Sequence, residues 1–129
     1  MTDIRLLIDR RFKLAESPLW DAAEQSLFWV EGYDGEIWSC RADGSDMQTW
    51  QVGTEIGAIA LREKGGVVIA LKYGLGLFDF ASGALESLAG PTGDDPAIRL
   101  NDGKVDPGGR FIVGSLDVAT IDGDRSTWP

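Results

Sequence analysis

Hydrophobic positions along the chain recur as short β-prone runs separated by polar turns. Three segments share one pattern, in which an apolar residue, a polar turn of about five residues and a second apolar run follow each other. The segments cover residues 20–30, 61–71 and 105–115, and their starts lie 41 and 44 residues apart. This pattern predicts a β-hairpin in each segment.

A further pair of strands is predicted after each of the first two hairpins. A turn is predicted to join residues 35–44 to 46–50, and another to join residues 76–83 to 84–88. Four strands in about 40 to 45 residues is the size of a β-propeller blade, whose faces are buried only when neighbouring blades stack on them. No long stretch carries helical periodicity, residues 4–13 coming nearest. The expected fold is therefore all-β, with two full four-stranded propeller repeats and part of a third.

The turn chemistry agrees with this interpretation. Asp-Gly pairs occur at 34–35, 43–44, 102–103 and 122–123, and Pro107 begins a Pro-Gly-Gly turn inside the third hairpin. Glycine supplies the positive φ that tight β-turns require. Aspartates beside glycines also suggest calcium loops, but none of these segments fits the pattern of an EF-hand loop. We therefore predict turns at all four pairs.

Two residue types that often carry function have simpler explanations here. The five tryptophans are spread among the repeats, which favours packing between blades over a platform for stacking sugars; they are Trp20, Trp29, Trp38, Trp50 and Trp128. Cys40 is the only cysteine and has no histidine or second cysteine beside it. It is interpreted as a small packed residue.

Length and charge narrow the class of protein. The 129 residues allow at most one domain, and a propeller of about 4 to 8 blades cannot close from two repeats and part of a third. We therefore expect residues 1–129 to form the N-terminal part of a propeller domain. A net charge of −9 argues against nucleic acid and anionic membranes as partners. Residues 1–10 mix charged with apolar side chains, so no secretory signal is predicted and a cytoplasmic location is expected.

The absence of histidine excludes several kinds of chemistry. The chain cannot form a Ser-His or Cys-His pair, a zinc site that contains histidine, or a histidine general base. Carboxylates and amides remain, and two segments are richer in them than packing requires. Residues 15–20 place Glu16 before the first hairpin, where it could also be simply solvated. Residues 99–106 place Arg99 and Asn101 two residues apart, on one face of an extended strand, which suits an oxygen-rich ligand.

These two segments, Glu-Ser-Pro-Leu-Trp at 16–20 and Arg-Leu-Asn-Asp-Gly-Lys-Val-Asp-Pro-Gly-Gly-Arg at 99–110, resemble the hallmark segments of the regucalcin/gluconolactonase family. The resemblance covers the chain from about Phe12 onward. It implies a six-bladed propeller with one divalent cation, calcium most often and zinc or another ion in some cases, that hydrolyses sugar-acid lactones. Glu16 would then be the first metal ligand, and Arg99 and Asn101 would hold the oxygens of the substrate.

The resemblance also implies functional residues that have no counterpart in this chain. A later asparagine and a later aspartate complete the metal site in this family, and that aspartate serves as the general acid/base. A further acidic contact to the substrate would fall near Ala119; Asp117 lies two residues away and is not assigned. Asp102 and Gly103 are expected to shape a turn. No catalytic residue is assigned within the chain.

Two functions therefore remain open at this point. The first is the N-terminal part of a metal-dependent lactonase, inactive alone because one carboxylate is too few for calcium, and completed by a complementary chain or by self-association. The alternative is a non-catalytic β-rich module for binding or interaction, and a calcium buffer is a third possibility. A monomeric chain that melts cooperatively would favour the module.

Overall fold

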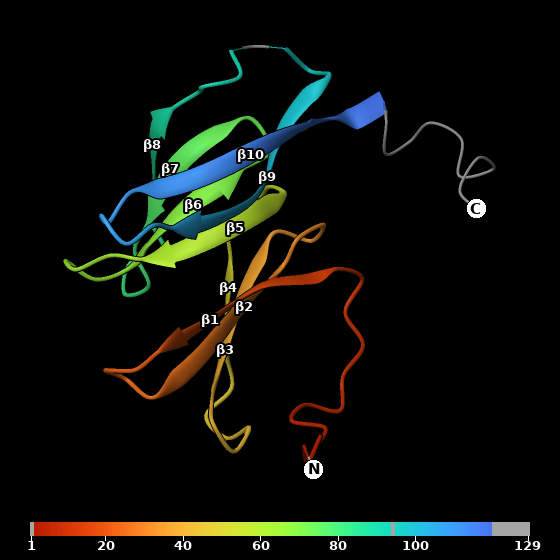
Figure 1. Ribbon diagram of the computed structural model, residues 1–129, viewed down its shortest axis with the longest axis vertical. Helices are drawn as coiled ribbons and strands as arrows, with labels where there is room; N and C mark the ends of the chain where they lie inside the picture. The colour runs from red at the N-terminus through yellow and green to blue at the C-terminus, as the bar shows by residue number, and fades with distance from the viewer. Residues whose placement is uncertain (1, 94, 120–129) are drawn as a thin grey trace.

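The computed structural model describes residues 2–93 and 95–119, which form ten β-strands in three antiparallel sheets (Figure 1). The first sheet has the order β1-β2-β3-β4 and the second the order β5-β6-β7-β8, whereas β9 and β10 pair with each other. The strands are β1 (Ala15–Asp21), β2 (Ser26–Glu31), β3 (Glu36–Arg41), β4 (Gln48–Gln51), β5 (Ile56–Leu61), β6 (Val67–Leu71), β7 (Gly74–Phe78), β8 (Leu85–Ala89), β9 (Ile98–Val105) and β10 (Phe111–Asp117). The predicted all-β fold, with two full blades and part of a third, is confirmed.

The three predicted hairpins are present, and the apolar residues that flank each turn pair with each other. Trp20 pairs with Leu27, and Val105 pairs with Phe111 at the same place in the third repeat. The first strand of each sheet begins five to seven residues earlier than the pattern indicated. Consequently the segments that carry the candidate site residues lie inside strands.

One predicted turn is wrong. The Asp-Gly pairs at 34–35 and 43–44 lie in turns, and their glycines have φ values of 68° and 84°. Asp102 and Gly103 instead lie within β9. A Cβ atom on Gly103 would lie 2.8 Å from the backbone oxygen of Ile112, so this glycine permits close strand pairing. The pair at 122–123 lies outside the described residues.

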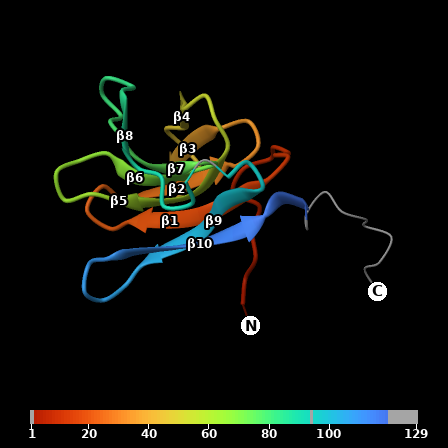
Figure 2. The ribbon, with the colours of Figure 1, turned by 90° about the horizontal axis from the view of Figure 1, so that it is seen from above.

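The blades stack through the first strand of each sheet, called here the inner strand. β5 contacts both β1 and β9. In the view from above, the first two sheets overlap, and β9 and β10 lie along one side of them (Figure 2). One apolar cluster joins blades 1 and 2 and includes Val30, Ile37, Ile56 and Ile69, all fully buried. A second cluster joins β9 to blade 2, with Leu100 packed on two buried alanines.

Tryptophan contributes to both faces of the first blade. The indole N–H of Trp50 donates a hydrogen bond of 3.1 Å to the backbone oxygen of Phe80 in the second blade. On the opposite face, Trp29 and Trp38 stack on each other and Phe12 meets both edge-on. Trp128 lies outside the described residues.

The surroundings of Cys40 agree with its interpretation from the sequence. Cys40 is 1% exposed within the Trp29–Trp38 cluster, so the interpretation of a packed residue is confirmed. Burial raises the pKa of its thiol. Within the described residues, no helix is long and apolar enough to cross a membrane.

Candidate functional site

The inner strands bring equivalent positions of the three repeats together. The 41- and 44-residue offsets align Glu16 of β1 with Gly57 of β5 and with Asn101 of β9. The pairing register of each inner strand with its neighbour shifts close to this position. Such bulges bend a strand and redirect its side chains, and they are frequent beside active sites. The predicted metal ligand and one predicted substrate residue therefore occupy the same place in blades 1 and 3.

Glu16 lies inside β1, opposite Val30, and is half-buried. The next residue, Ser17, has a φ of 53°, which is uncommon for a residue other than glycine. Ser17 is buried, and its Oγ accepts a hydrogen bond of 3.1 Å from the backbone N–H of Ile59 in β5. This bond fixes the bulge beside Glu16 against the second blade.

A second carboxylate, Glu31, holds the start of β1. Glu31 is 2% exposed, and its Oε1 accepts a hydrogen bond of 2.6 Å from the backbone N–H of Leu14. Its Oε2 accepts a second bond, 3.0 Å long, from the backbone N–H of Asp34. Buried carboxylates need such partners. Glu31 therefore anchors the chain two residues before Glu16.

Asn101 depends on the absence of a side chain in the neighbouring blade. A Cβ atom on Gly57 would lie 2.8 Å from the Cα of Asn101, and closer still to its carbonyl oxygen. Only glycine lets β5 and β9 approach this closely without displacement. Asn101 is half-buried at the bulge of β9.

Arg99 is buried, with a side chain that is 8% exposed. Its Nη1 lies 3.8 Å from Oε2 of Glu55, and the same oxygen lies 2.9 Å from Nζ of Lys72. The backbone reinforces the arrangement, because the N–H of Lys72 donates to the oxygen of Glu55 and the N–H of Leu100 donates to the oxygen of Lys72. Arg99, Glu55 and Lys72 thus form one charged cluster across blades 2 and 3.

The electrostatics couple this cluster to Glu16. Burial raises the pKa of Glu16 above its ordinary value, Arg99 lowers it in part, and Asp102 and Glu31 add to the increase. A carboxylate with this environment suits a hard cation that prefers oxygen ligands. Within the described ranges, however, no three or more His, Cys, Asp or Glu side chains lie close enough together to hold a metal ion.

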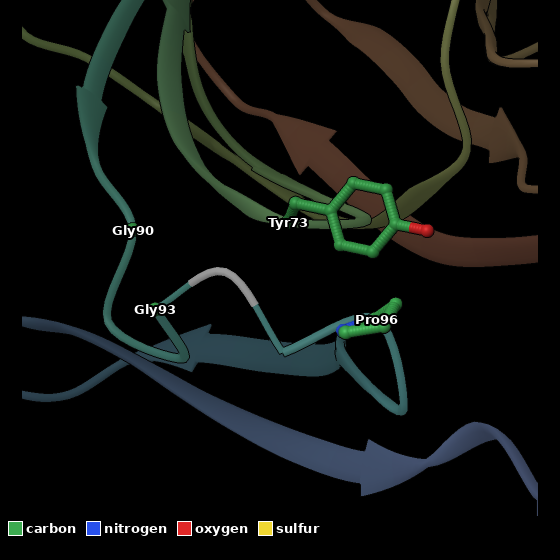
Figure 3. A pocket seen from close by; sticks show the side chains of 4 residues that line it. All are labelled: Tyr73, Gly90, Gly93 and Pro96. Carbon is green, nitrogen blue, oxygen red and sulfur yellow. The ribbon is translucent and has the colours of Figure 1, made fainter.

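Two pockets in the described part of the chain bear on this site. One, of about 620 Å³, has Tyr73, Gly90, Gly93 and Pro96 among its lining residues (Figure 3). The site residues are not among these, although Nζ of Lys72 lies 5.5 Å from the ring centroid of Tyr73. A groove of about 360 Å³, lined mainly by apolar residues, has Glu16 among its lining residues.

The chain matches a known family over most of its length. Residues 14–126 match the profile of the family described as the SMP-30/Gluconolactonase/LRE-like region. The chain belongs to this family. The match includes Glu16, Arg99 and Asn101, and it confirms the family resemblance on which their interpretation rests.

Two similar members of the SMP-30/gluconolactonase family are named as lactonases. The chain is 39% identical to the 6-deoxy-6-sulfogluconolactonase of Pseudomonas putida over 80% of its own length and 35% of that protein. It is 35% identical to the L-arabinolactonase of Azospirillum brasilense, covering 87% of the chain and 37% of that protein. The chain thus spans little more than a third of the length of these relatives.

A solved structure shares the fold. The calcium-binding protein regucalcin from Agrobacterium tumefaciens superimposes with a TM-score of 0.81 at 26% identity, over 88% of this chain and 38% of that one. The assignment of the described sheets to propeller blades is therefore confirmed. The roles of Glu16, Arg99 and Asn101 stay predictions.

The structure also adds residues that the apolar pattern did not reveal. Glu31, Glu55 and Lys72 support the site, and Gly57 makes room for it. The repeat offsets contained a signal for two of them, because they align Glu55 with Arg99 and Gly57 with Asn101. The other contacts depend on how the blades stack.

Proposed function

We propose that this chain supplies part of the active site of a sugar-lactone hydrolase that depends on a divalent cation, with calcium the favoured ion. One observation carries the proposal: Glu16 of blade 1 and Asn101 of blade 3 occupy equivalent places at the bulges of two inner strands that both contact β5. The lactonases among the family members support the substrate class. The calcium-binding regucalcin supports the choice of ion.

The donor chemistry of the chain fits calcium better than zinc. The residues offered at the site are a carboxylate and an amide, whereas the chain has no histidine and its cysteine is buried elsewhere. Glu16 would hold the ion through its carboxylate oxygens. Calcium takes about six to eight oxygen ligands, so Glu16 would provide only a part of the set.

The side chains of the chain have distinct roles in the proposed reaction. A bound divalent cation would polarise the lactone carbonyl and stabilise the negative charge that develops when water adds. Arg99 and Asn101 would donate hydrogen bonds to substrate oxygens and fix the orientation of the ring. We assign the proton transfers to no residue of this chain.

We expect the 129 residues alone to bind calcium weakly and to hydrolyse lactones negligibly, because a single carboxylate cannot replace the full ligand set. Calorimetry with calcium and a proton-release assay with a sugar lactone would test this. Micromolar one-to-one binding together with turnover would contradict it, and would indicate that copies of the chain associate to complete a site.

The lactonase proposal itself is tested with a fusion protein. In this fusion, the chain replaces the third of the P. putida 6-deoxy-6-sulfogluconolactonase that it matches. We expect calcium-dependent hydrolysis of sugar lactones. The variant Glu16→Gln should lose the calcium dependence together with the activity, whereas Glu86→Gln, which changes an exposed carboxylate on β8, should retain both.

The same fusion tests the proposed contacts of Arg99 and Asn101 with the substrate. Arg99→Met and Asn101→Ala should raise KM by about tenfold or more, because each removes a hydrogen bond to the substrate. Arg11→Met, at an exposed position, is the matched control. A folded fusion that hydrolyses no lactone would instead favour the non-catalytic binding module.

A further inference from the structure

The buried guanidinium of Arg99 requires a counter-charge that the predicted site does not provide. Its side chain is 8% exposed, and a buried charge is costly unless it is paired. Within the described residues, its Nε has no hydrogen-bond partner, and Glu55 is the carboxylate that lies within 4.0 Å of it. Arg99 is therefore held mainly from one side.

Glu55 has the geometry to hold Arg99 from that side. It occupies the position of blade 2 that corresponds to Arg99 in blade 3, immediately before the inner strand β5. Its backbone oxygen accepts a hydrogen bond from Lys72, whose own oxygen accepts one from Leu100. The backbone next to Arg99 is thus tied to the backbone that carries Glu55, so the two side chains face each other across a fixed interval.

Lys72 limits how strongly Glu55 can bind Arg99. Its Nζ lies 2.9 Å from Oε2 of Glu55, closer than the 3.8 Å that separates this oxygen from Arg99. A carboxylate shared in this way balances part of the charge of each cation. Within the described residues Oε2 of Glu55 has no hydrogen-bond partner, so its contact with Arg99 is one of charge. The guanidinium therefore keeps N–H groups available for a substrate.

We infer that Glu55 is a positioning residue for Arg99, an inference that rests on the proposed function of Arg99 in binding a lactone. Glu55 touches no substrate in this assignment. It fixes the direction of the guanidinium, whereas Lys72 competes for the same carboxylate oxygen and is not required for substrate binding.

The first test uses the chain itself and needs no activity. In a ¹⁵N-labelled sample, the Nε–H signal of Arg99 is assigned by its loss in Arg99→Met. We expect Glu55→Gln to shift this signal and to accelerate its exchange with water, and Glu86→Gln to leave it unchanged. An Arg99 signal that is identical in Glu55→Gln and in the unmodified chain would overturn the inference.

The second test measures kinetics in the lactonase fusion. Glu55→Gln should raise KM by about threefold to thirtyfold with little change in kcat, and Glu55→Asp should recover part of the loss. In the Arg99→Met background, Glu55→Gln should have no further effect. Lys72→Met should not raise KM, whereas it would reproduce Glu55→Gln if Glu55 served only to bind Lys72.

The outcomes separate this inference from the function on which it rests. If Arg99→Met leaves KM unchanged, the proposed role of Arg99 fails, and the NMR experiment still decides whether Glu55 orients it. If Arg99→Met raises KM but Glu55→Gln does not, or if the two effects add, the positioning role of Glu55 is wrong.

Discussion

The Oγ of Ser17 accepts a hydrogen bond of 3.1 Å from the backbone N–H of Ile59. This bond joins the inner strands of the first two blades one residue after Glu16, at a bulge where Ser17 has a positive φ. Ser17 and Ile59 are both buried. The strained conformation beside the proposed metal ligand is thus stabilised from the neighbouring blade.

Replacement of Ser17 by alanine should destabilise the chain by about 1–3 kcal/mol, because the N–H of Ile59 would stay buried without a partner. Alanine has the same difficulty with a positive φ as serine, so the effect reports the hydrogen bond. Urea unfolding provides the measurement. Ser87→Ala, at an exposed position of β8, should stay within about 0.5 kcal/mol, and equal values for the two variants would contradict the prediction.

Glu31→Gln should also destabilise the chain by about 1–3 kcal/mol, because an amide has one acceptor oxygen where the carboxylate uses two. The amide NH₂ would face a backbone N–H and leave it unsatisfied. In the lactonase fusion, calcium affinity should fall as well, since β1 would lose its anchor two residues before Glu16. Thermal unfolding and calorimetry measure the two effects, with Glu86→Gln as the control; an unchanged calcium affinity would exclude a link to Glu16.

Much of the fold follows directly from the sequence, because strand pairing is a local property. The apolar runs and the glycines with positive φ determine the hairpins, and the registers at Trp20 and Val105 agree with the predicted pattern. The inner strands begin earlier than predicted because a bulge interrupts the pairing near the start of each. Polar side chains also break the apolar pattern in β1 and β9, whereas β5 is apolar throughout. The pair Asp102-Gly103 was predicted to form a turn because Asp-Gly is a local turn signal. Gly103 instead permits close pairing of β9 with β10.

The candidate site was predictable only in part. Glu16, Arg99 and Asn101 could be named from two short segments, but nothing local indicates that Glu55 meets Arg99. That contact depends on the stacking of blades 2 and 3, which joins residues 44 positions apart. The repeat offsets supply the missing alignment, since equivalent positions in neighbouring blades lie close together.

Gly57→Ala should destabilise the chain by about 1–3 kcal/mol, because the new Cβ would overlap the backbone of Asn101 and separate β5 from β9. Gly114→Ala is a matched control, since a Cβ there would lie 3.8 Å from the oxygen of Asp102, an ordinary contact. Denaturant unfolding of both variants measures the difference. In the fusion, Gly57→Ala should also raise KM through Asn101; a variant as stable as Gly114→Ala would show that β9 does not pack against Gly57.

Acid should weaken the turn between β7 and β8 of the second blade. The carboxylate of Asp79 accepts hydrogen bonds of 2.7 Å from both the backbone N–H and the Oγ of Ser82, and these bonds lower its pKa below the ordinary 3.8. Because the folded state binds this proton less tightly than the unfolded state, the stabilisation is fully present above pH 3.8 and is lost as the pH falls through the lowered pKa. Asp79→Asn should therefore lower Tm at neutral pH, and the difference from the unmodified chain should shrink as the pH falls below 3.8. Glu63→Gln, at an exposed position after β5, is the control. A difference that persists undiminished far below pH 3.8 would show that the charge of Asp79 is not its source.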